Sequence, residues 1–156
     1  MHIQWLVKKF EALSPYELYA ILRLRNEVFV VEQNCVFQDA DDKDQNSWHF
    51  MGFINHKLIA YTRLVPAGEI HGECSIGRVV TSPSFRGKGI GRELMDQSIA
   101  KVYELFGAQP IKIGAQVYLK EFYESFGFQQ VSDVYMEDGI EHIYMVKQMP
   151  AIQVSC

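Results

Sequence analysis

The chain has 156 residues, 48% of them hydrophobic, and a formal net charge of -4 at pH 7. This length suits one well-packed domain and is too short for two ordinary ones, so we expect a single domain over residues 1–156. The acidic balance argues against nucleic acid as a partner, because binding to phosphate backbones requires a basic surface.

The cysteines Cys35, Cys74 and Cys156 are odd in number and lack metal-ligand spacing, so we expect reduced thiols and no metal site. No apolar run approaches the length of a membrane span, and the N-terminus lacks the charged-then-apolar pattern of a secretory signal. We therefore expect a cytoplasmic protein that does not engage a membrane.

The first half of the chain predicts a strand, a helix and a hairpin. Residues 3–8 are a candidate strand. Ser14-Pro15-Tyr16-Glu17 has the form of a capping box with proline at the first helical position, and apolar residues follow at helical spacing as far as Phe29. Residues 48–54 and 58–65 are two further strands around a short turn.

Two charged features interrupt this region. Arg25 falls on the apolar stripe of the helix. A charged side chain there either extends to solvent at the edge of the buried face or is paired in a cleft. Residues 39–44 are rich in aspartate, and such a run is usually a solvated loop. An acidic rim could also attract a cationic amine.

The stretch SIGRVVTSPSFRGKGIGREL, residues 75–94, organises the rest of the chain. A β-branched strand over residues 76–81 is stopped by Pro83, and a glycine-rich turn then leads into a helix that runs to Phe106. Glycines allow backbone N–H groups to approach a ligand closely, and a helix N-terminus carries partial positive charge. This arrangement predicts a phosphate pocket.

The spacing of this turn excludes two common phosphate motifs. A dinucleotide fingerprint needs G-x-G-x-x-G, but Arg92 and Glu93 follow Gly91. A P-loop needs Ser or Thr after Gly-Lys, but Gly89 follows Lys88.

The remaining residues predict a strand over 111–117, a short helix over 118–126, and strands over 128–136 and 140–149 around the turn Glu137-Asp138-Gly139. The whole pattern indicates an α+β domain with a central mixed, mostly antiparallel β-sheet flanked by helices.

The pattern Arg86-x-x-Gly89-x-Gly91 after a strand resembles the coenzyme-A loop of the GNAT superfamily of N-acetyltransferases. The order of elements is similar to the GNAT fold, and residues 122–128, FYESFGF, resemble an aromatic element of that family. Segments at 28–35, 76–79, 114–116, 122–128 and 134–143 resemble the ElaA-like branch in particular.

The resemblance implies acetyl-CoA as co-substrate and a primary amine, on a small molecule or a peptide, as acceptor. In this family the central strand bends away from its neighbour and holds the pantetheine arm, a role that carries over to Val79, Val80 and Thr81. Gln116 stands where the family often has a cofactor-binding asparagine. The diphosphate would contact the loop residues Arg86, Gly87, Lys88, Gly89, Ile90, Gly91 and Arg92. A homodimer is left open.

The resemblance also assigns chemistry. Tyr123 matches the general acid, since a phenol with a pKa of about 10 stays protonated at pH 7. The backbone N–H of Val79 would polarise the thioester carbonyl. The general base has four candidates. Glu73 and His49 are expected among the catalytic residues. Glu32 and His142 are expected, with Arg25, to bind the substrate.

Transfer through an acetylated Cys74 is less well supported than direct transfer in a ternary complex, because no base adjoins that cysteine in the sequence. Three alternatives stay open. Acyl-homoserine-lactone synthases share this fold and an arginine followed by Val-Phe, like Arg25, Val28 and Phe29, although they are generally longer. The others are a non-catalytic acetyl-CoA-binding module and a domain without a ligand.

Overall fold

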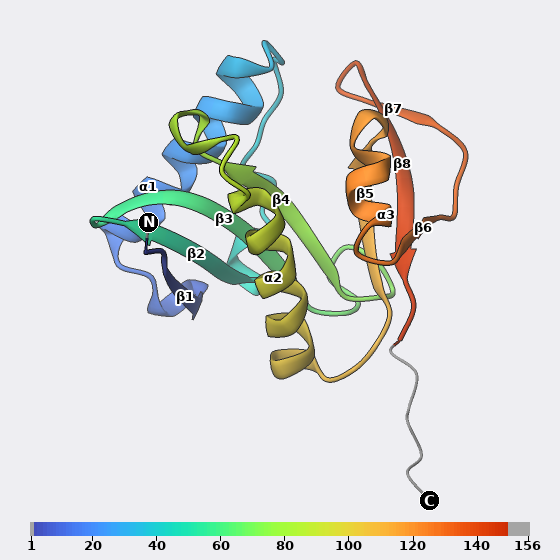
Figure 1. The fold of residues 1–156 in the computed structure, drawn as a ribbon, viewed down its shortest axis with the longest axis horizontal. Coiled ribbons are helices and arrows are strands. Elements are labelled where there is room, and N and C mark those ends of the chain that lie inside the picture. The colour runs from blue at the N-terminus through green and yellow to red at the C-terminus, as the bar shows by residue number, and fades with distance from the viewer. Residues whose placement is uncertain (1, 150–156) are drawn as a thin grey trace, which may run out of the picture.

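Residues 2–149 are described by a computed structural model (Figure 1), so Cys156 lies outside the described residues. The main elements, in chain order, are β1 (Gln4–Lys9), α1 (Pro15–Arg25), the π-helical segment η2 (Asn26–Glu32), β2 (Trp48–Ile54), β3 (Lys57–Val65), β4 (Ser75–Thr81), α2 (Ile90–Phe106), β5 (Ile111–Gln116), α3 (Lys120–Glu124), β6 (Phe128–Gln130), β7 (Tyr135–Glu137) and β8 (Ile140–Lys147).

The strands form two antiparallel sheets. The first has the order β1-β2-β3-β4, and the second has the order β5-β8-β6 with β7 also on β8. The sheets meet where Cys74 and Ile111 make a parallel bridge and the Lys112 amide donates to the Cys74 carbonyl at 2.9 Å. Beyond that point β4 and β5 diverge (Figure 1). The expected α+β fold is confirmed, and its central sheet is split into two.

Helices cover both faces of the first sheet. The capping box at the start of α1 is confirmed: Ser14 Oγ accepts from the Glu17 amide at 3.1 Å, and Glu17 Oε1 accepts from the Ser14 amide at 2.8 Å. α1 packs Ile21 and Leu24 against Tyr61 on one face. On the other face, the core contains buried side chains of α2, of β3 and β4, and of β5 and β8. Because α2 contributes to this shared core, it joins the two sheets.

Two predicted elements differ from the structure. The α-helix expected to reach Phe29 ends at Arg25 and continues as η2, a wider turn that is uncommon and often lies at functional sites. The single strand expected over residues 128–136 was wrong. It is divided into β6 and β7 because Ser132 Oγ accepts from the Tyr144 amide at 2.8 Å and Gln130 Nε2 donates to the Ser132 carbonyl at 2.7 Å, which interrupts the ladder.

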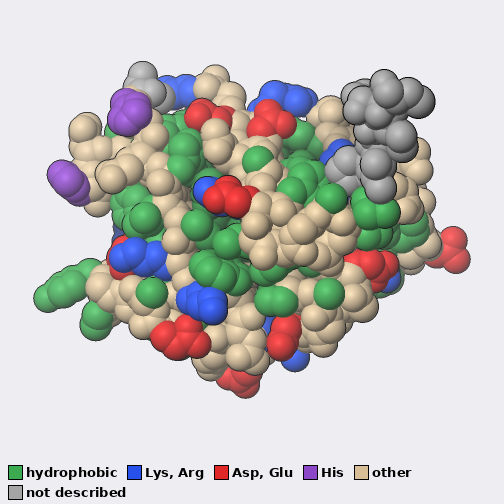
Figure 2. Space-filling model, turned by 90° about the horizontal axis from the view of Figure 1, so that it is seen from below, with side chains coloured by type: hydrophobic (Ala, Val, Ile, Leu, Met, Phe, Trp, Pro, Cys, Tyr) green, Lys and Arg blue, Asp and Glu red, His purple; other side chains and the backbone are tan. Residues whose placement is uncertain are grey.

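On the face drawn in Figure 2, acidic and basic side chains are interspersed among apolar and polar ones rather than separated by sign. Within residues 2–149, no helix has the length and apolar character needed to cross a membrane.

Candidate active site

A cleft of about 690 Å³ lies where β4 and β5 diverge. One wall is formed by η2 and the loop that follows it, and the other by residues of β5, the start of α3 and the β7–β8 hairpin. Residues 76–81 of β4 line it between these walls. The predicted pantetheine-binding residues Val79, Val80 and Thr81 therefore line this cleft.

A β-bulge interrupts β4 inside this cleft. Tyr61 pairs with Val80 and Arg63 pairs with Gly77, so Thr62 alone stands opposite both Arg78 and Val79. The extra residue reverses the alternation of side chains along the strand. Ile76 consequently packs into the core beneath α2 while Val80, four residues later, packs on the α1 face. The bulge leaves Val79 without a partner residue in the ladder.

The glycine-rich turn after β4 provides a run of free amides at one end of the cleft. Gly87 has φ 78° and Gly89, the N-cap of α2, has φ 75°, conformations that glycine adopts without strain. Within residues 2–149, no amide from Arg86 to Arg92 donates to a protein acceptor, whereas the next one, Glu93, bonds the Gly89 carbonyl at 3.1 Å. These N–H groups form an anion cradle at a helix N-terminus.

Side chains of the turn leave this cradle open. Ile90 is buried in the core, so it offers only its amide. Arg92 donates to Ser125 Oγ at 2.8 Å and stacks over the Phe126 ring at 4.8 Å. A Cβ placed on Gly89 or Gly91 would meet nothing within 4 Å, so both glycines border open space.

Arg86 reaches η2 from the glycine-rich turn that follows β4. Its Nη1 and Nη2 lie 2.7 Å from the two carboxylate oxygens of Glu32. The hydrogen bond from Arg86 is the main cause that lowers the pKa of Glu32 from its ordinary value. Both residues line the cleft, and they are paired with each other.

Tyr123 lines the cleft from α3 and is 6% exposed. Its ring packs edge-on against Phe122 and Phe128, with ring centroids 5.2 and 6.1 Å apart, so the hydroxyl has a fixed position. Burial raises the pKa of Tyr123 above that of a free phenol, chiefly by penalising the phenolate. This side chain is therefore a protonated donor at neutral pH.

His142 and Gln116 face each other across β8 and β5, and both line the cleft. His142 Nδ1 lies 2.8 Å from the Ile140 carbonyl, which requires the proton on Nδ1 and leaves Nε2 as the acceptor. Glu137 Oε2 lies 3.4 Å from that Nε2. Gln116 donates from Nε2 to Gln33 Oε1 at 3.5 Å, a weak contact that a ligand can replace.

His49 and Glu73 do not line the cleft, which corrects their placement with the catalytic residues. His49 is fully buried, with Nδ1 2.7 Å from the Tyr61 hydroxyl and Nε2 2.9 Å from the Asp44 carbonyl. Burial lowers the pKa of His49, so the ring is a neutral structural group. Glu73 precedes β4 next to the Cys74–Ile111 bridge, at the closed end where the sheets join.

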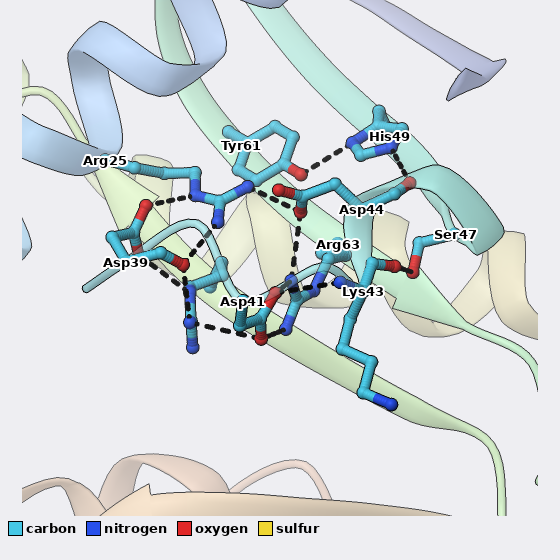
Figure 3. Close-up of polar contacts among 10 residues, drawn as sticks. Arg25, Asp39, Asp41, Lys43, Asp44, Ser47, His49, Tyr61 and Arg63 are labelled. Carbon is cyan, nitrogen blue, oxygen red and sulfur yellow. Dashed lines mark hydrogen bonds and ion pairs between the residues drawn. The ribbon is translucent and has the colours of Figure 1, made fainter. Parts of the chain in front are cut away.

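Arg25 is also unavailable to a substrate, because it is fully buried and paired (Figure 3). Its Nε lies 2.8 Å from Asp39 Oδ2 and its Nη1 lies 2.7 Å from Asp44 Oδ1. The second of the two readings of Arg25, a paired charge, is the correct one.

The aspartate-rich loop is not the solvated loop that its composition suggests. Asp39, Asp41 and Asp44 all form ion pairs with arginines, and Arg63 holds both oxygens of Asp41 at 2.7 and 2.9 Å. The residues that the sequence reasoning missed are Arg63 and Arg78. Their signal was a charge inside an apolar strand, which has to be paired when it is buried.

Cys74 lies at the closed end of the cleft, where its Sγ donates to the Pro110 carbonyl at 3.3 Å. Burial raises the pKa of the Cys74 thiol to about 11, so little thiolate forms at neutral pH. A poorly ionised thiol is a weak nucleophile, which disfavours an acetyl-cysteine intermediate at Cys74.

A family model described as an acetyltransferase (GNAT) domain matches residues 26–149, a range that contains every cleft element above. The chain belongs to the GNAT acetyltransferase family. The expectation drawn from the glycine-rich turn and the aromatic element is thereby confirmed, and the chain is a GNAT-type acetyltransferase.

Relatives support the narrower resemblance to the ElaA-like branch. The chain is 40% identical to protein ElaA of Escherichia coli over 149 residues, covering 94% of this chain and 97% of ElaA. The crystal structure of Escherichia coli ElaA superimposes with a TM-score of 0.88 over 94% of this chain and all of that one. An acyl-CoA N-acyltransferase structure from Pseudomonas aeruginosa, 39% identical, gives a TM-score of 0.90 over 94% of this chain and 99% of that one.

A GNAT acetyltransferase from Elizabethkingia anophelis, solved with acetyl-CoA bound, has the same fold with a TM-score of 0.63 and 18% identity. The superposition covers 94% of this chain and 98% of that chain. Because the identity is low, the likeness extends to the fold alone.

Proposed function

We propose that this protein transfers the acetyl group of acetyl-CoA directly to a primary amine, with both substrates bound in the cleft at once. The observation that carries the proposal is the run of unpartnered amides from Arg86 to Arg92, at one end of a cleft whose interior holds Tyr123 and the β4 bulge.

The cradle fits the diphosphate of coenzyme A. Backbone N–H groups at a helix N-terminus bind phosphate through both hydrogen bonds and the helix dipole. The exposed side chain of Lys88 adds positive charge beside it. Bound acetyl-CoA would supply an activated thioester, and Val79, Val80, Thr81 and Gln116 would hold its pantetheine arm along β4.

Acyl transfer also needs a donor for the developing oxyanion and an acid for the leaving thiolate. The amide of Val79 suits the first role because the bulge removes it from the regular ladder. Tyr123 suits the second because its hydroxyl is protonated and lines the same cleft.

The amine must lose a proton, and we assign His142 as the base. Of the candidate bases, only Glu32 and His142 line the cleft, and both oxygens of Glu32 are held by Arg86. His142 keeps Nε2 as its acceptor, and this nitrogen lies 3.4 Å from Glu137 Oε2. Transfer of the amine proton to Nε2 would complete an ion pair with Glu137.

The test is a coenzyme-A release assay with acetyl-CoA and a panel of amines: a polyamine, amino acids, an aminoglycoside and a short peptide with a free N-terminus. Mass spectrometry should find an N-acetylated product with at least one of these amines. Acetyl-CoA binding by calorimetry without coenzyme-A release from any amine would favour a non-catalytic binding module. The absence of a thermal shift with acetyl-CoA would overturn the proposal altogether.

A further inference from the structure

Arg78 has an unusual backbone conformation for its place in the chain. Its φ is 50°, in the left-handed region. Within residues 2–149, the other non-glycine residues with positive φ are Asn, Asp or His and lie in turns or bends, whereas Arg78 lies within a strand. Because an arginine in this region is strained, something in the surrounding structure has to hold it there.

The strain is located at the bulge. Arg78 and Val79 are the two residues that face Thr62 alone, so the left-handed turn at Arg78 determines how the peptide that carries the Val79 amide is oriented. If Arg78 relaxed to an extended conformation, the strand could pair regularly with β3. Val79 would then lose the position that the bulge gives it.

The side chain of Arg78 is anchored away from its own strand. Its Nε lies 2.8 Å from Asp39 Oδ1, its Nη2 donates to the Asp39 carbonyl at 3.0 Å, and Nη2 also lies 3.3 Å from Asp41 Oδ2. These acceptors belong to the loop that follows η2, so the anchor ties the bulge to a separate part of the chain.

The anchoring loop is itself held by two buried arginines, Arg25 and Arg63 (Figure 3). Arg25 holds Asp39, Arg63 holds Asp41, and both arginines meet at Asp44 Oδ1, at 2.7 and 2.9 Å. The side chains of Arg25 and Arg63 are 0% and 3% exposed, so both guanidinium groups are shielded from solvent and hold the carboxylates in fixed positions. Arg63 and Arg78 together hold the pKa of Asp41 at about 2, so its charge persists at neutral pH.

We propose that Asp39 and Asp41, acting through Arg78, are positioning residues that hold the β4 bulge in its left-handed conformation and so aim the Val79 amide at the acyl group. This inference rests on the proposed function of the cleft. It also gives the acidic loop a role: its carboxylates are used in supporting the bulge rather than in attracting an amine.

The first test compares Arg78→Gly, Arg78→Ala and Arg78→Val. All three remove the guanidinium and leave Asp39 and Asp41 without it, and they differ in side-chain size and in how readily residue 78 adopts positive φ. Glycine does so freely, alanine at a cost, and valine least readily. We expect kcat to fall in the order Gly, Ala, Val, with Gly at least about tenfold above Val and the acetyl-CoA Kd equal within about threefold. Equal kcat in the three variants would overturn the proposal, and so would a Kd that weakens in parallel with kcat.

A second pair of variants keeps the test decisive if Arg78→Val does not fold. Asp39→Asn should lower kcat, and Arg78→Gly added to Asp39→Asn should raise kcat again, because glycine no longer needs the anchor. A merely structural role for Asp39 predicts the opposite, since removing Arg78 takes away a further ion pair. A double variant no faster than the single one would therefore overturn the proposal.

A spectroscopic readout separates this inference from the proposed function. The ¹³C carbonyl resonance of [1-¹³C]acetyl-CoA should move downfield on binding to the wild-type protein, as expected for a carbonyl that accepts a hydrogen bond, and should move less in Arg78→Val than in Arg78→Gly. The same bound shift in both variants would overturn the positioning role while leaving the proposed function intact. No binding of acetyl-CoA to the wild-type protein would overturn both.

Discussion

Arg86 and Glu32 tie the glycine-rich turn to η2 through a double ion pair, with both nitrogen–oxygen distances at 2.7 Å. Arg86 opens the glycine-rich turn and Glu32 ends η2, so the pair places a carboxylate beside the cradle for a diphosphate. The anion that the cradle is proposed to bind would compete with Glu32 for the same guanidinium.

Glu32→Gln should therefore tighten acetyl-CoA binding, because it frees Arg86 and removes a negative charge near the diphosphate. Both partners are partly exposed, so we expect a gain of about two- to fivefold in Kd, measured by calorimetry. Glu27→Gln is the matched control, since Glu27 lies on the same segment with the same 39% side-chain exposure and pairs with Arg23. Weaker binding by Glu32→Gln would mean that Glu32 assists the cofactor rather than competing with it.

Gly89→Val should weaken acetyl-CoA binding by at least about tenfold. Its side chain would project into open space beside the free amides, and φ 75° is unfavourable for valine. Gly68→Val controls for strain, because Gly68 has φ 91° and open surroundings but lies in a different loop. Calorimetry should show the loss only at Gly89, and an equal loss at both positions would point to general destabilisation.

Tyr123→Phe should lower kcat by about 10²-fold while changing the acetyl-CoA Kd little, because an acid contributes in the transition state. The raised pKa of Tyr123 also means that its ionisation should not reduce kcat below about pH 10. Tyr118→Phe is the control, since Tyr118 lines the same cleft but is 73% exposed. Steady-state kinetics of both variants would decide, and an unchanged kcat for Tyr123→Phe would remove it from the mechanism.

His142→Gln should lower kcat by about 10²-fold, measured by steady-state kinetics, because it removes the proposed proton acceptor. His49→Gln is the comparison. It should keep kcat but lower the melting temperature, since it breaks the buried contacts to Tyr61 and Asp44. If the two variants exchanged these outcomes, His49 would be the functional histidine.

The free energy of unfolding should decrease in two steps as the pH falls. His49 has a lowered pKa in the folded protein, so the unfolded chain takes up its proton first and stability is lost below about pH 6.5. Asp41 has a folded pKa of about 2, so its contribution is complete above about pH 4 and is lost as the pH approaches 2. Urea titrations followed by circular dichroism at several pH values would show both steps. His49→Gln should remove the upper step and leave the lower one.

The sequence by itself determined the family and most of the order of elements, and it predicted a phosphate cradle. These features are local in the chain. A strand, a glycine-rich turn and a helix N-terminus form a phosphate cradle from consecutive residues, so the spacing of Arg86, Gly89 and Gly91 was enough to indicate it. The cap at Ser14 was equally readable, because it depends on residues three apart.

The tertiary structure alone decided what lies in the cleft and what lies beneath it. His49 and His142 look equivalent along the chain. In the structure, His49 of β2 is fully buried, whereas His142 of β8 lines the cleft between the sheets. The aspartate run looked solvated because its partners, Arg25, Arg63 and Arg78, are distant in sequence and meet it only after β3, β4 and α1 have packed. Burial and ion pairing are properties of three-dimensional neighbours, and local spacing does not encode them.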